Sequence, residues 1–412
     1  MATQVAEVFY EIAGSDAPVR FTAYDGSAAG PADAEIKVNV VTPRAVTYLA
    51  SAPGSLGFAR AYIMGDIELT GDIYDVLRMF TNLSISDMGM GTKIGLARKL
   101  GPLAMKRAPR PAEEARMTGR LHSQSRDAQA IAHHYNVSNR FYELVLGPSM
   151  AYTCAVYPTA ESTLEEAQWA KHDLVARKLG LTSGMRLLDV GCGWGGMVRH
   201  AAKEYGVKAL GVTLSQAQAE YAQKRIADEG LSDLAEVRFL DYRKVEESDF
   251  DAVSAIGLAE HIGRAQMPSY FSSIYDKVKP GGRFLNHCIT RPKSTDKAID
   301  KGGFIDRYVF PDGELTAAGP LATTMQDAGF EVRHLENLRE HYGMTCAAWG
   351  VNLEANWDEA VAEVGAPRAK VWQIYLAGSR LNFERDEIEL HQILGVRLDG
   401  KNAHFPLRPQ FQ

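Results

Sequence analysis

Residues 185–196 read Met-Arg-Leu-Leu-Asp-Val-Gly-Cys-Gly-Trp-Gly-Gly, an apolar run followed directly by a glycine-rich turn. The run Met185–Val190 has the length and character of a buried strand, and the sequence after Gly196 is typical of a helix. Glycines permit a tight turn and let the backbone approach a nucleotide, whose polar groups meet free N–H donors at the helix start. This stretch therefore predicts a nucleotide-binding α/β domain.

Further elements extend the pattern on both sides of this stretch. Strands are expected at about 208–213, 235–240, 250–256 and 282–289. Helices are expected up to about residue 146, over 164–179, and between the strands. Strands that alternate with helices predict a Rossmann-like α/β fold, with a mostly parallel sheet covered on both faces.

The chain divides into three segments by composition. Residues 1–107 mix strand-like runs such as Ile36–Val41 with helical stretches, which predicts a small N-terminal α+β domain. Residues 108–127 are polar and contain Pro109 and Pro111, which is typical of a linker. Residues 128–412 would form the larger, nucleotide-binding domain.

Charge and cysteine usage exclude several classes of function. The formal net charge of −6 argues against general nucleic-acid binding, which requires a basic surface. The four cysteines are widely spaced, so no metal site or redox dithiol is expected, and a reduced cytoplasmic setting fits best. Neither a cleaved secretion signal nor an apolar run of roughly 20 residues is apparent, so we expect a soluble or peripheral protein.

A basic segment lies between Lys93 and Arg110. It contains six lysines and arginines, no acidic residue, and several interleaved apolar side chains. Such a segment suits an anionic lipid surface, where each basic residue contributes about 1 kcal/mol. We therefore expect peripheral association with the inner face of the membrane. The alternative is a solvated linker, because Gly101 and Pro102 interrupt any long helix.

The ligand of the glycine turn follows from the residues around it. A dinucleotide site would need an acidic residue about 20 positions downstream, but the next strand ends in Gly211-Val212-Thr213 without one. Asp189 could instead orient the turn, and Asp241-Tyr242 after the following strand could face an adenine ring. A dinucleotide dehydrogenase is therefore disfavoured.

Residues 187–196 and the run Gly211-Val212-Thr213-Leu214-Ser215-Gln216-Ala217-Gln218 resemble the cofactor motifs of the cyclopropane-fatty-acid synthases and mycolic acid methyltransferases. The resemblance extends from about residue 128 to 392. It implies a class I methyltransferase fold and S-adenosylmethionine as the cofactor. The cofactor-binding residues that it and the preceding argument indicate are Tyr135, Tyr152, Thr153, Asp189, Gly191, Gly193, Thr213, Leu214, Gln218, Asp241 and Tyr242.

Four further segments resemble the reacting site of that family: residues 150–155, 256–261, 287–289 and 341–343. In the family a bicarbonate ion held by these positions serves as the general base. The resemblance implies an anion cage formed by Cys154, Glu260, His287, Tyr342 and, through its backbone, Ile289. Each residue alone has a structural explanation, since a lone buried cysteine is usually packing.

The chemistry places a demand on this cage. Attack of a cis double bond on a sulfonium methyl group needs alignment in a dry cavity, and the resulting carbocation must lose a proton to a base. Two bare anions in contact would repel strongly in a low-dielectric site. Glu260 or the bicarbonate must therefore present a proton, or His287 must be charged, and the sequence leaves these alternatives open.

Two further segments bear on the acceptor. Residues 305–313 resemble the family's insertion over the acyl pocket, which implies that Tyr308 and Phe310 touch the substrate; an ordinary aromatic-anchored turn is the alternative. Residues 65–73 resemble the N-terminal domain of the phospholipid-acting synthases, which implies an accessory, lipid-binding role for residues 1–107. We therefore expect a phospholipid with a cis-unsaturated acyl chain as the substrate, and the resemblance implies a homodimer.

The C-terminal residues 381–385 and 390–394 resemble the actinobacterial branch linked to 10-methyl-branched acids. They favour a methylene-branched product, which a separate reductase would convert to a methyl branch, over a cyclopropane. Two other functions stay open, namely methylation of a small molecule and lipid binding without catalysis. A relic cofactor loop would fit the latter, but the joint presence of Glu260, His287 and Tyr342 argues against it.

Overall fold

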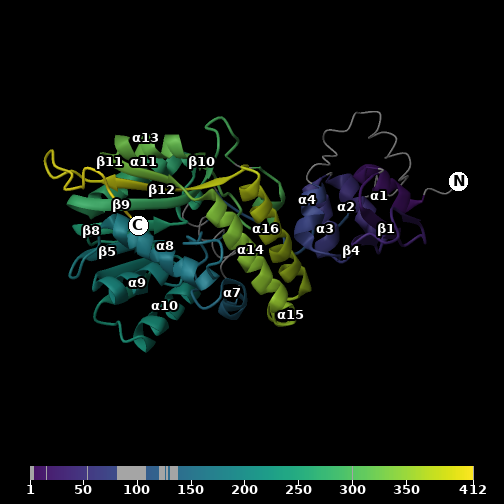
Figure 1. The fold of residues 1–412 in the computed structure, drawn as a ribbon, viewed down its shortest axis with the longest axis horizontal. Helices are drawn as coiled ribbons and strands as arrows, with labels where there is room; N and C mark the ends of the chain where they lie inside the picture. Colours follow the sequence, from purple (N-terminus) through teal and green to yellow (C-terminus); the bar gives the residue numbers. More distant parts are fainter. Residues whose placement is uncertain are drawn as a thin grey trace. The chain divides into compact units, whose positions relative to one another are not determined.

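The computed structural model describes residues 4–14, 16–52, 54–80, 108–119, 126, 129, 138–298 and 300–411. They belong to two compact units (Figure 1). Unit 1 takes in residues 1–116, 301–309 and 357–381, and unit 2 takes in residues 117–300, 310–356 and 382–412. This grouping differs from the sequential division predicted above, because two segments from the C-terminal half of the chain pack within unit 1.

Unit 1 contains a four-stranded sheet of order β2-β1-β3-β4, in which β1 and β3 are parallel and the outer pairs are antiparallel. Its elements are α1 (Val5–Ala13), β1 (Val19–Ala23), β2 (Ala28–Ala29), β3 (Ile36–Val40), α2 (Pro43–Ser51), α3 (Ser55–Ile63), β4 (Ile67–Thr70), α4 (Ile73–Phe80), α12 (Phe304–Tyr308), α15 (Trp357–Val364) and most of α16 (Ala366–Glu384). Thr42 caps α2, and the buried Asp66 accepts from the Thr42 hydroxyl and the Arg44 guanidinium.

Unit 2 is built on an eight-stranded sheet of order β11-β12-β9-β8-β5-β6-β7, with β10 beside β9. The strands are β5 (Arg186–Val190), β6 (Lys208–Thr213), β7 (Ala235–Phe239), β8 (Phe250–Ile256), β9 (Val278–Arg291), β10 (Thr316–Ala317), β11 (Glu331–Asn337) and β12 (Glu389–Val396). All pairs are parallel except those of β12 with β9 and β11. The predicted mostly parallel α/β fold is confirmed.

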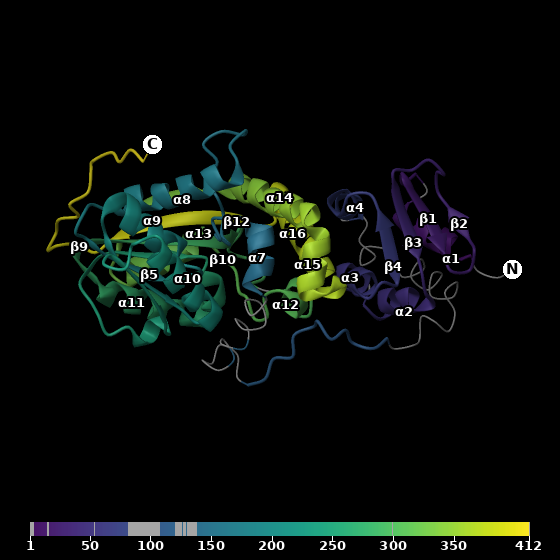
Figure 2. The ribbon, with the colours of Figure 1, turned by 90° about the horizontal axis from the view of Figure 1, so that it is seen from below.

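Helices cover both faces of this sheet. The helices that cover it are α8 (Leu164–Leu179), α9 (Gly196–Tyr205), α10 (Gln216–Asp228), α11 (Met267–Lys277), α13 (Ala318–Asp327) and α14 (Arg339–Ala355), and α7 (Asn139–Leu146) packs against α14 and α10. Leu187 packs with α8, α9 and α10, whereas its neighbour Leu188 packs with α11 and α13, as the alternation of a strand requires. Figure 2 shows α8 on one side of β12 and α11 on the other.

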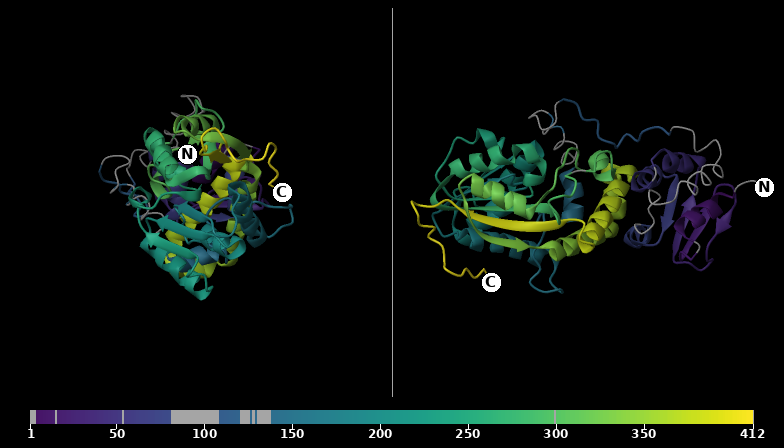
Figure 3. Two further views of the ribbon diagram at one scale, coloured as in Figure 1. Left: turned by 90° about the vertical axis from the view of Figure 1, so that its left-hand side faces the viewer. Right: turned by 90° about the horizontal axis from the view of Figure 1, so that it is seen from above.

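Local sequence explains the ends of α8. Thr163 and Glu166 form a capping box at its start, and Gly180 adopts a left-handed conformation at its end. The chain after β12 continues along unit 2 (Figure 3), where Phe405 and Phe411 pack against the same core as α8. No helix among the described residues is long and apolar enough to span a bilayer.

The strand order locates the site. The chain runs outward from β5 to β6 and β7, and then returns to the opposite side of β5 as β8. This reversal creates a crevice at the carboxyl ends of β5 and β8, where ligands bind in open α/β sheets. The glycine turn that follows β5 and the segment Gly257–His261 that follows β8 both begin at this crevice.

Candidate active site

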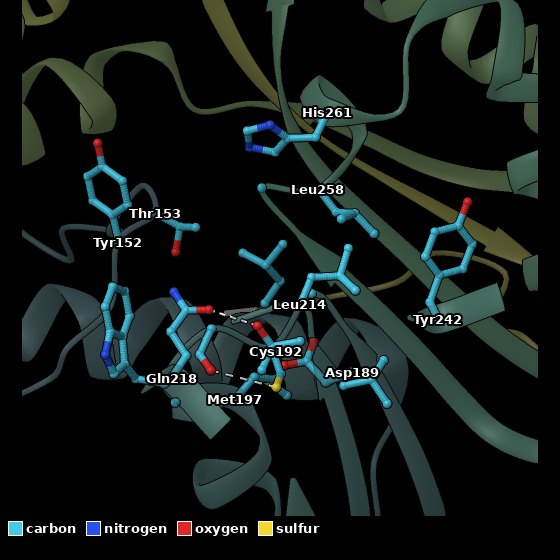
Figure 4. A pocket seen from close by; sticks show the side chains of 18 of the residues that line it. Tyr152, Thr153, Asp189, Cys192, Met197, Leu214, Gln218, Tyr242, Leu258 and His261 are labelled. Atoms are coloured by element: carbon cyan, nitrogen blue, oxygen red, sulfur yellow. Dashed lines mark hydrogen bonds between the residues drawn. The ribbon is translucent and has the colours of Figure 1, made fainter. Parts of the chain in front are cut away.

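A pocket opens at this edge of the sheet in unit 2. It encloses about 1550 Å³ including its open mouth, and residues of the glycine turn, of β6, and of the segments that follow β7 and β8 line it. Figure 4 shows Tyr152 and Tyr242 on opposite sides of the pocket, with Leu214 and Gln218 between them in this view. The lining combines apolar walls with a few polar groups, which is typical of a small-molecule site.

The glycine turn approaches the pocket through its backbone. Gly191 has φ +76°, and a Cβ atom there would meet the Leu258 side chain at 3.2 Å. Trp194 is buried, and its indole N–H donates to Asn139 Oδ1 at 2.9 Å, which ties the turn to α7. The left-handed backbone and the close approach of Leu258 both favour glycine at position 191, where the turn lines the pocket with its backbone.

The end of β6 supplies polar groups beside the turn. Thr213 Oγ1 donates to Gln218 Oε1 at 2.7 Å, and Ser215 caps the helix that carries Gln218. Leu214 and Gln218 line the pocket together with Leu240 and Tyr242, which follow β7. An apolar slot with an amide at its edge suits an adenosine group, whose ring is flat and whose ribose carries hydroxyls.

The opposite end of the pocket contains a buried cation that the sequence did not single out. Lys171 of α8 is 1% exposed, and its Nζ donates to Thr153 Oγ1 at 2.8 Å. Burial lowers the pKa of Lys171 to about 8. The available signal was a lysine on the stripe of α8 that carries the buried Ala167 and Val175, where an apolar residue would be expected.

The structure brings most of the predicted cofactor residues together. Those that line the pocket are Tyr152, Thr153, Asp189, Gly191, Gly193, Thr213, Leu214, Gln218 and Tyr242. The Asp241 carboxylate is instead paired with the Arg243 guanidinium at 2.6 Å, and it is absent from the lining. Tyr135 lies outside the described residues. Asp189 accepts from Ser254 Oγ at 2.6 Å, and burial raises the pKa of this carboxyl to about 6.

Two predicted members of the anion cage are in direct contact. The Ile289 backbone N–H donates to Glu260 Oε1 at 2.7 Å, so it holds the carboxyl group in place. The other oxygen, Glu260 Oε2, is buried and has no hydrogen-bond partner among the described residues. Burial raises the pKa of Glu260 to about 7, which is well above the ordinary value of a carboxyl group.

His287 lies on β9, two residues before Ile289. The backbone N–H of Gly257 donates to the His287 carbonyl at 2.8 Å, so residues 257–260 run beside residues 287–289. His287 Nε2 is buried and, within the described part of the chain, has no hydrogen-bond partner. Burial and the Lys171 and Lys178 ammonium groups lower the pKa of His287 well below its usual range, so the ring is neutral near pH 7.

Cys154 and Tyr342 are buried in unit 2. Cys154 Sγ donates to the Ala155 carbonyl at 3.1 Å, and burial raises the pKa of its thiol well above the ordinary value, so the thiol stays protonated. Tyr342 of α14 stacks on Phe383, with ring centroids 4.4 Å apart, and lies edge-on to Trp349. The Trp349 ring in turn packs against Tyr152 of the pocket lining.

Only part of the segment 305–313, which was predicted to cover the acyl pocket, lies at the pocket. Pro311 and Asp312 line the pocket, and the Phe310 ring lies edge-on to His261, another lining residue, at 5.6 Å. Tyr308 is buried in unit 1, where its hydroxyl lies 3.3 Å from Glu114 Oε1, and it is absent from the pocket lining. Substrate contact by Phe310 and Tyr308 stays a prediction.

The residues present fit both groups that the sequence implies. The glycine turn, Thr213 and Gln218 line one part of the pocket, where they would hold the nucleoside of S-adenosylmethionine. Glu260 Oε2 and His287 Nε2 are buried polar atoms in adjacent segments, and a small oxyanion could partner both.

Comparison with known proteins places these features in a family. The family profile of mycolic acid cyclopropane synthetase matches residues 122–393. A probable fatty acid methyltransferase of Mycobacterium tuberculosis is 50% identical over 421 aligned residues, which cover 99% of this chain and 98% of the relative. Cyclopropane mycolic acid synthase 2 of Mycobacterium leprae is 36% identical over 273 residues, covering 61% of this chain and 87% of that protein.

Solved structures agree with the sequence relatives. The cyclopropane synthase MmaA2 from Mycobacterium tuberculosis superposes with a TM-score of 0.62 and 31% identity, over 67% of this chain and all of that one. The mycolic acid cyclopropane synthase CmaA1, in a complex with SAH and CTAB, gives a TM-score of 0.61 and 31% identity, over 65% of this chain and 97% of that one.

Proposed function

Because the chain belongs to the mycolic acid cyclopropane synthetase family, we propose that it modifies the cis double bond of an unsaturated acyl chain in a phospholipid. Its class as an S-adenosylmethionine-dependent methyltransferase that acts on lipids, predicted from the sequence, is confirmed. The phospholipid acceptor, the base and the product are the proposed parts.

One observation carries the proposal: Glu260 Oε2 and His287 Nε2 are both buried and without partners among the described residues. Glu260 lies in the segment that follows β8, and His287 lies on the adjacent strand β9. Buried polar atoms rarely stay unpaired, so a polar ligand is expected there. A bicarbonate ion fits, because neutral Glu260 can donate one hydrogen bond and neutral His287 another. Of the alternatives left open above, the raised pKa of Glu260 favours a protonated carboxyl over a charged histidine.

When bound, S-adenosylmethionine would supply a sulfonium methyl group, whose carbon–sulfur bond breaks as a carbon–carbon bond to the alkene forms, leaving a carbocation on the acyl chain. Thr213, Leu214 and Gln218 would hold the nucleoside, and Tyr152 and Thr153 the methionine end. Glu260, His287 and Ile289 would place the bicarbonate that accepts the proton. Cys154 and Tyr342 would complete the anion cage, as the resemblance implies.

Two observations on the N-terminal part of the chain support a lipid acceptor. First, a relative named a probable fatty acid methyltransferase matches 99% of this chain, so the match includes unit 1 as well as unit 2. The basic segment Lys93–Arg110, of which residues 93–107 lie outside the described part, suits anionic headgroups. We propose in addition that the protein associates peripherally with the membrane and forms a homodimer. A separate reductase would act on a methylene-branched product.

Mass spectrometry of the product tests the proposal. Vesicles of cis-monounsaturated phosphatidylglycerol are incubated with the protein and S-adenosylmethionine that carries a CD3 group. A one-carbon-longer chain with two deuteriums is expected for either proposed product, because a methylene branch and a cyclopropane both form when the transferred CD3 group loses one deuteron. Deuterium NMR of that product distinguishes an olefinic CD2 group, which indicates the proposed methylene branch, from a ring CD2 group, which indicates a cyclopropane. Three retained deuteriums would indicate a methyl branch beside an internal double bond and would contradict both products. Absence of transfer to any lipid, with cofactor binding shown by calorimetry, would overturn the phospholipid assignment and favour a small-molecule acceptor or a binding protein.

A further inference from the structure

A chain of polar side chains leads from the surface of unit 2 to His287. Glu336 of β11 contacts Lys178 Nζ, and the Lys178 side chain is 1% exposed. Lys178 Nζ donates to Gln392 Oε1 at 2.7 Å, and Gln392 Nε2 lies 3.1 Å from His287 Nδ1. Gln392 and His287 are register partners on β12 and β9, so the backbone holds their side chains on one face. Neither Lys178 nor Gln392 has a role in the proposed reaction.

The donors and acceptors of Lys178, Gln392 and His287 fix the direction of the hydrogen bonds between them. Burial lowers the pKa of Lys178, and the Glu336 carboxylate in contact with Nζ opposes this shift and favours the charged ammonium form. An ammonium group has donors and no acceptor. The amide atom that faces Lys178 must therefore be the oxygen, which turns the amide NH₂ toward His287. An NH₂ group only donates, so His287 Nδ1 must be the acceptor and carries no proton.

From this we infer that Lys178 and Gln392 are positioning residues that hold His287 as the Nε2–H tautomer, with this N–H directed at the anion in the active site. His287 Nε2 has no acceptor in the described part of the chain, so its N–H is available to a ligand. The identity of that ligand as bicarbonate rests on the proposed function. The tautomer follows from the contacts alone.

The tautomer decides what His287 can do. With a proton on Nε2 and Gln392 bonded to Nδ1, the ring has no free lone pair with which to accept the substrate proton. His287 therefore binds the base and is not the base itself. Its role parallels that of a metal-binding histidine whose outer nitrogen is fixed by a second residue, where the partner sets which nitrogen faces the ligand.

The tautomer is measured directly on the full-length protein. Histidines are labelled with ¹⁵N, and long-range ¹H–¹⁵N correlation spectra distinguish protonated from unprotonated ring nitrogens; a His287→Gln spectrum identifies the signals of His287. We expect protonated Nε2 and unprotonated Nδ1. A proton on Nδ1 would overturn the inference, whether or not the protein methylates lipid. Absence of methylation with the expected tautomer would count only against the proposed function.

Variants test the link to the anion. Gln392→Glu replaces the NH₂ group with a carboxylate oxygen, which accepts a hydrogen bond. His287 is then expected to carry a proton on Nδ1. Either the ring stays neutral and Nε2 becomes an acceptor, or both nitrogens are protonated and the ring is charged. The matched control is His391→Gln on the same strand, whose side chain points to the opposite face and contacts Thr290. In ¹⁵N spectra we expect a protonated Nδ1 in Gln392→Glu and an unchanged His287 in the control.

The same variants are assayed for the bicarbonate concentration that gives half-maximal turnover. Loss of a hydrogen bond to a charged ligand costs about 1.5–3 kcal/mol, so we expect this concentration to rise about ten-fold or more if Nε2 loses its proton. A positively charged His287 ring would instead lower the bicarbonate concentration that gives half-maximal turnover. The ¹⁵N spectra show whether the ring is neutral or charged. An unchanged His287 spectrum in Gln392→Glu would overturn the role of Gln392, and circular dichroism confirms that each variant is folded.

Discussion

Replacement of Glu260 by glutamine should remove a pH-dependent loss of stability from unit 2. Burial raises the pKa of Glu260 from 4.5 to about 7 in the folded protein. In the unfolded chain the carboxyl ionises near its ordinary value, so the unfolded state binds fewer protons between about pH 4.5 and 7. Stability therefore falls across this window as the pH rises and is constant above it. A shift of about 2.5 units corresponds to about 3 kcal/mol.

Glutamine has no such titration but keeps both contacts of the carboxyl group. Its Oε1 can accept from the Ile289 N–H, and its NH₂ can donate where protonated Glu260 would donate. The free energy of unfolding of Glu260→Gln should therefore rise relative to wild type by about 3 kcal/mol between pH 4.5 and 7.5. Turnover by the variant should also lack the decline that ionisation of Glu260 causes above about pH 7 in wild type.

The assay is urea denaturation followed by tryptophan fluorescence at several pH values, in buffer free of carbon dioxide so that no bicarbonate stabilises the folded state. The difference between the two proteins at each pH is the informative quantity, because the titrations of all other groups cancel. Glu204→Gln, at an exposed position on α9, reports the effect of removing a surface carboxylate. A wild-type to Glu260→Gln difference that does not change with pH would refute the reasoning.

Three further predictions concern the cofactor pocket, each measured by calorimetry. Gln218→Leu, which leaves the Thr213 hydroxyl without its acceptor, should weaken S-adenosylmethionine binding about ten-fold. Gly191→Ala should also weaken S-adenosylmethionine binding about ten-fold, and it should lower the free energy of unfolding by about 1–3 kcal/mol, because an L-residue at φ +76° is strained. Unchanged affinity and stability would contradict this prediction. Lys171→Met should weaken binding of S-adenosylmethionine but not of its decarboxylated analogue, since Lys171 donates to Thr153, which we propose holds the methionine end. The affinity of the wild type should fall above about pH 8, where Lys171 loses its proton.

The sequence by itself determined the layout of unit 2 and most of the cofactor pocket. Alternating apolar runs and helical stripes located β5, β6 and β8 because the patterns depend only on neighbouring residues. The glycine turn after β5 could also be recognised from neighbouring residues alone, because its positive φ angles favour glycine. The family motifs identified Glu260, His287 and Ile289 as candidates for the anion cage, and the structure brings Glu260 and Ile289 into contact.

Only the tertiary structure decided how distant residues act on the site. Lys171 and Lys178 lie on the buried stripe of α8, and nothing in a single sequence reveals that Thr153 or Gln392 will meet them. The pairing of β9 with β12 joins His287 to Gln392, 105 residues apart, and thereby fixes which ring nitrogen carries a proton. Burial, which raises the pKa of Glu260, is likewise a property of the packed sheet and its helices, because desolvation depends on atoms contributed from the whole domain.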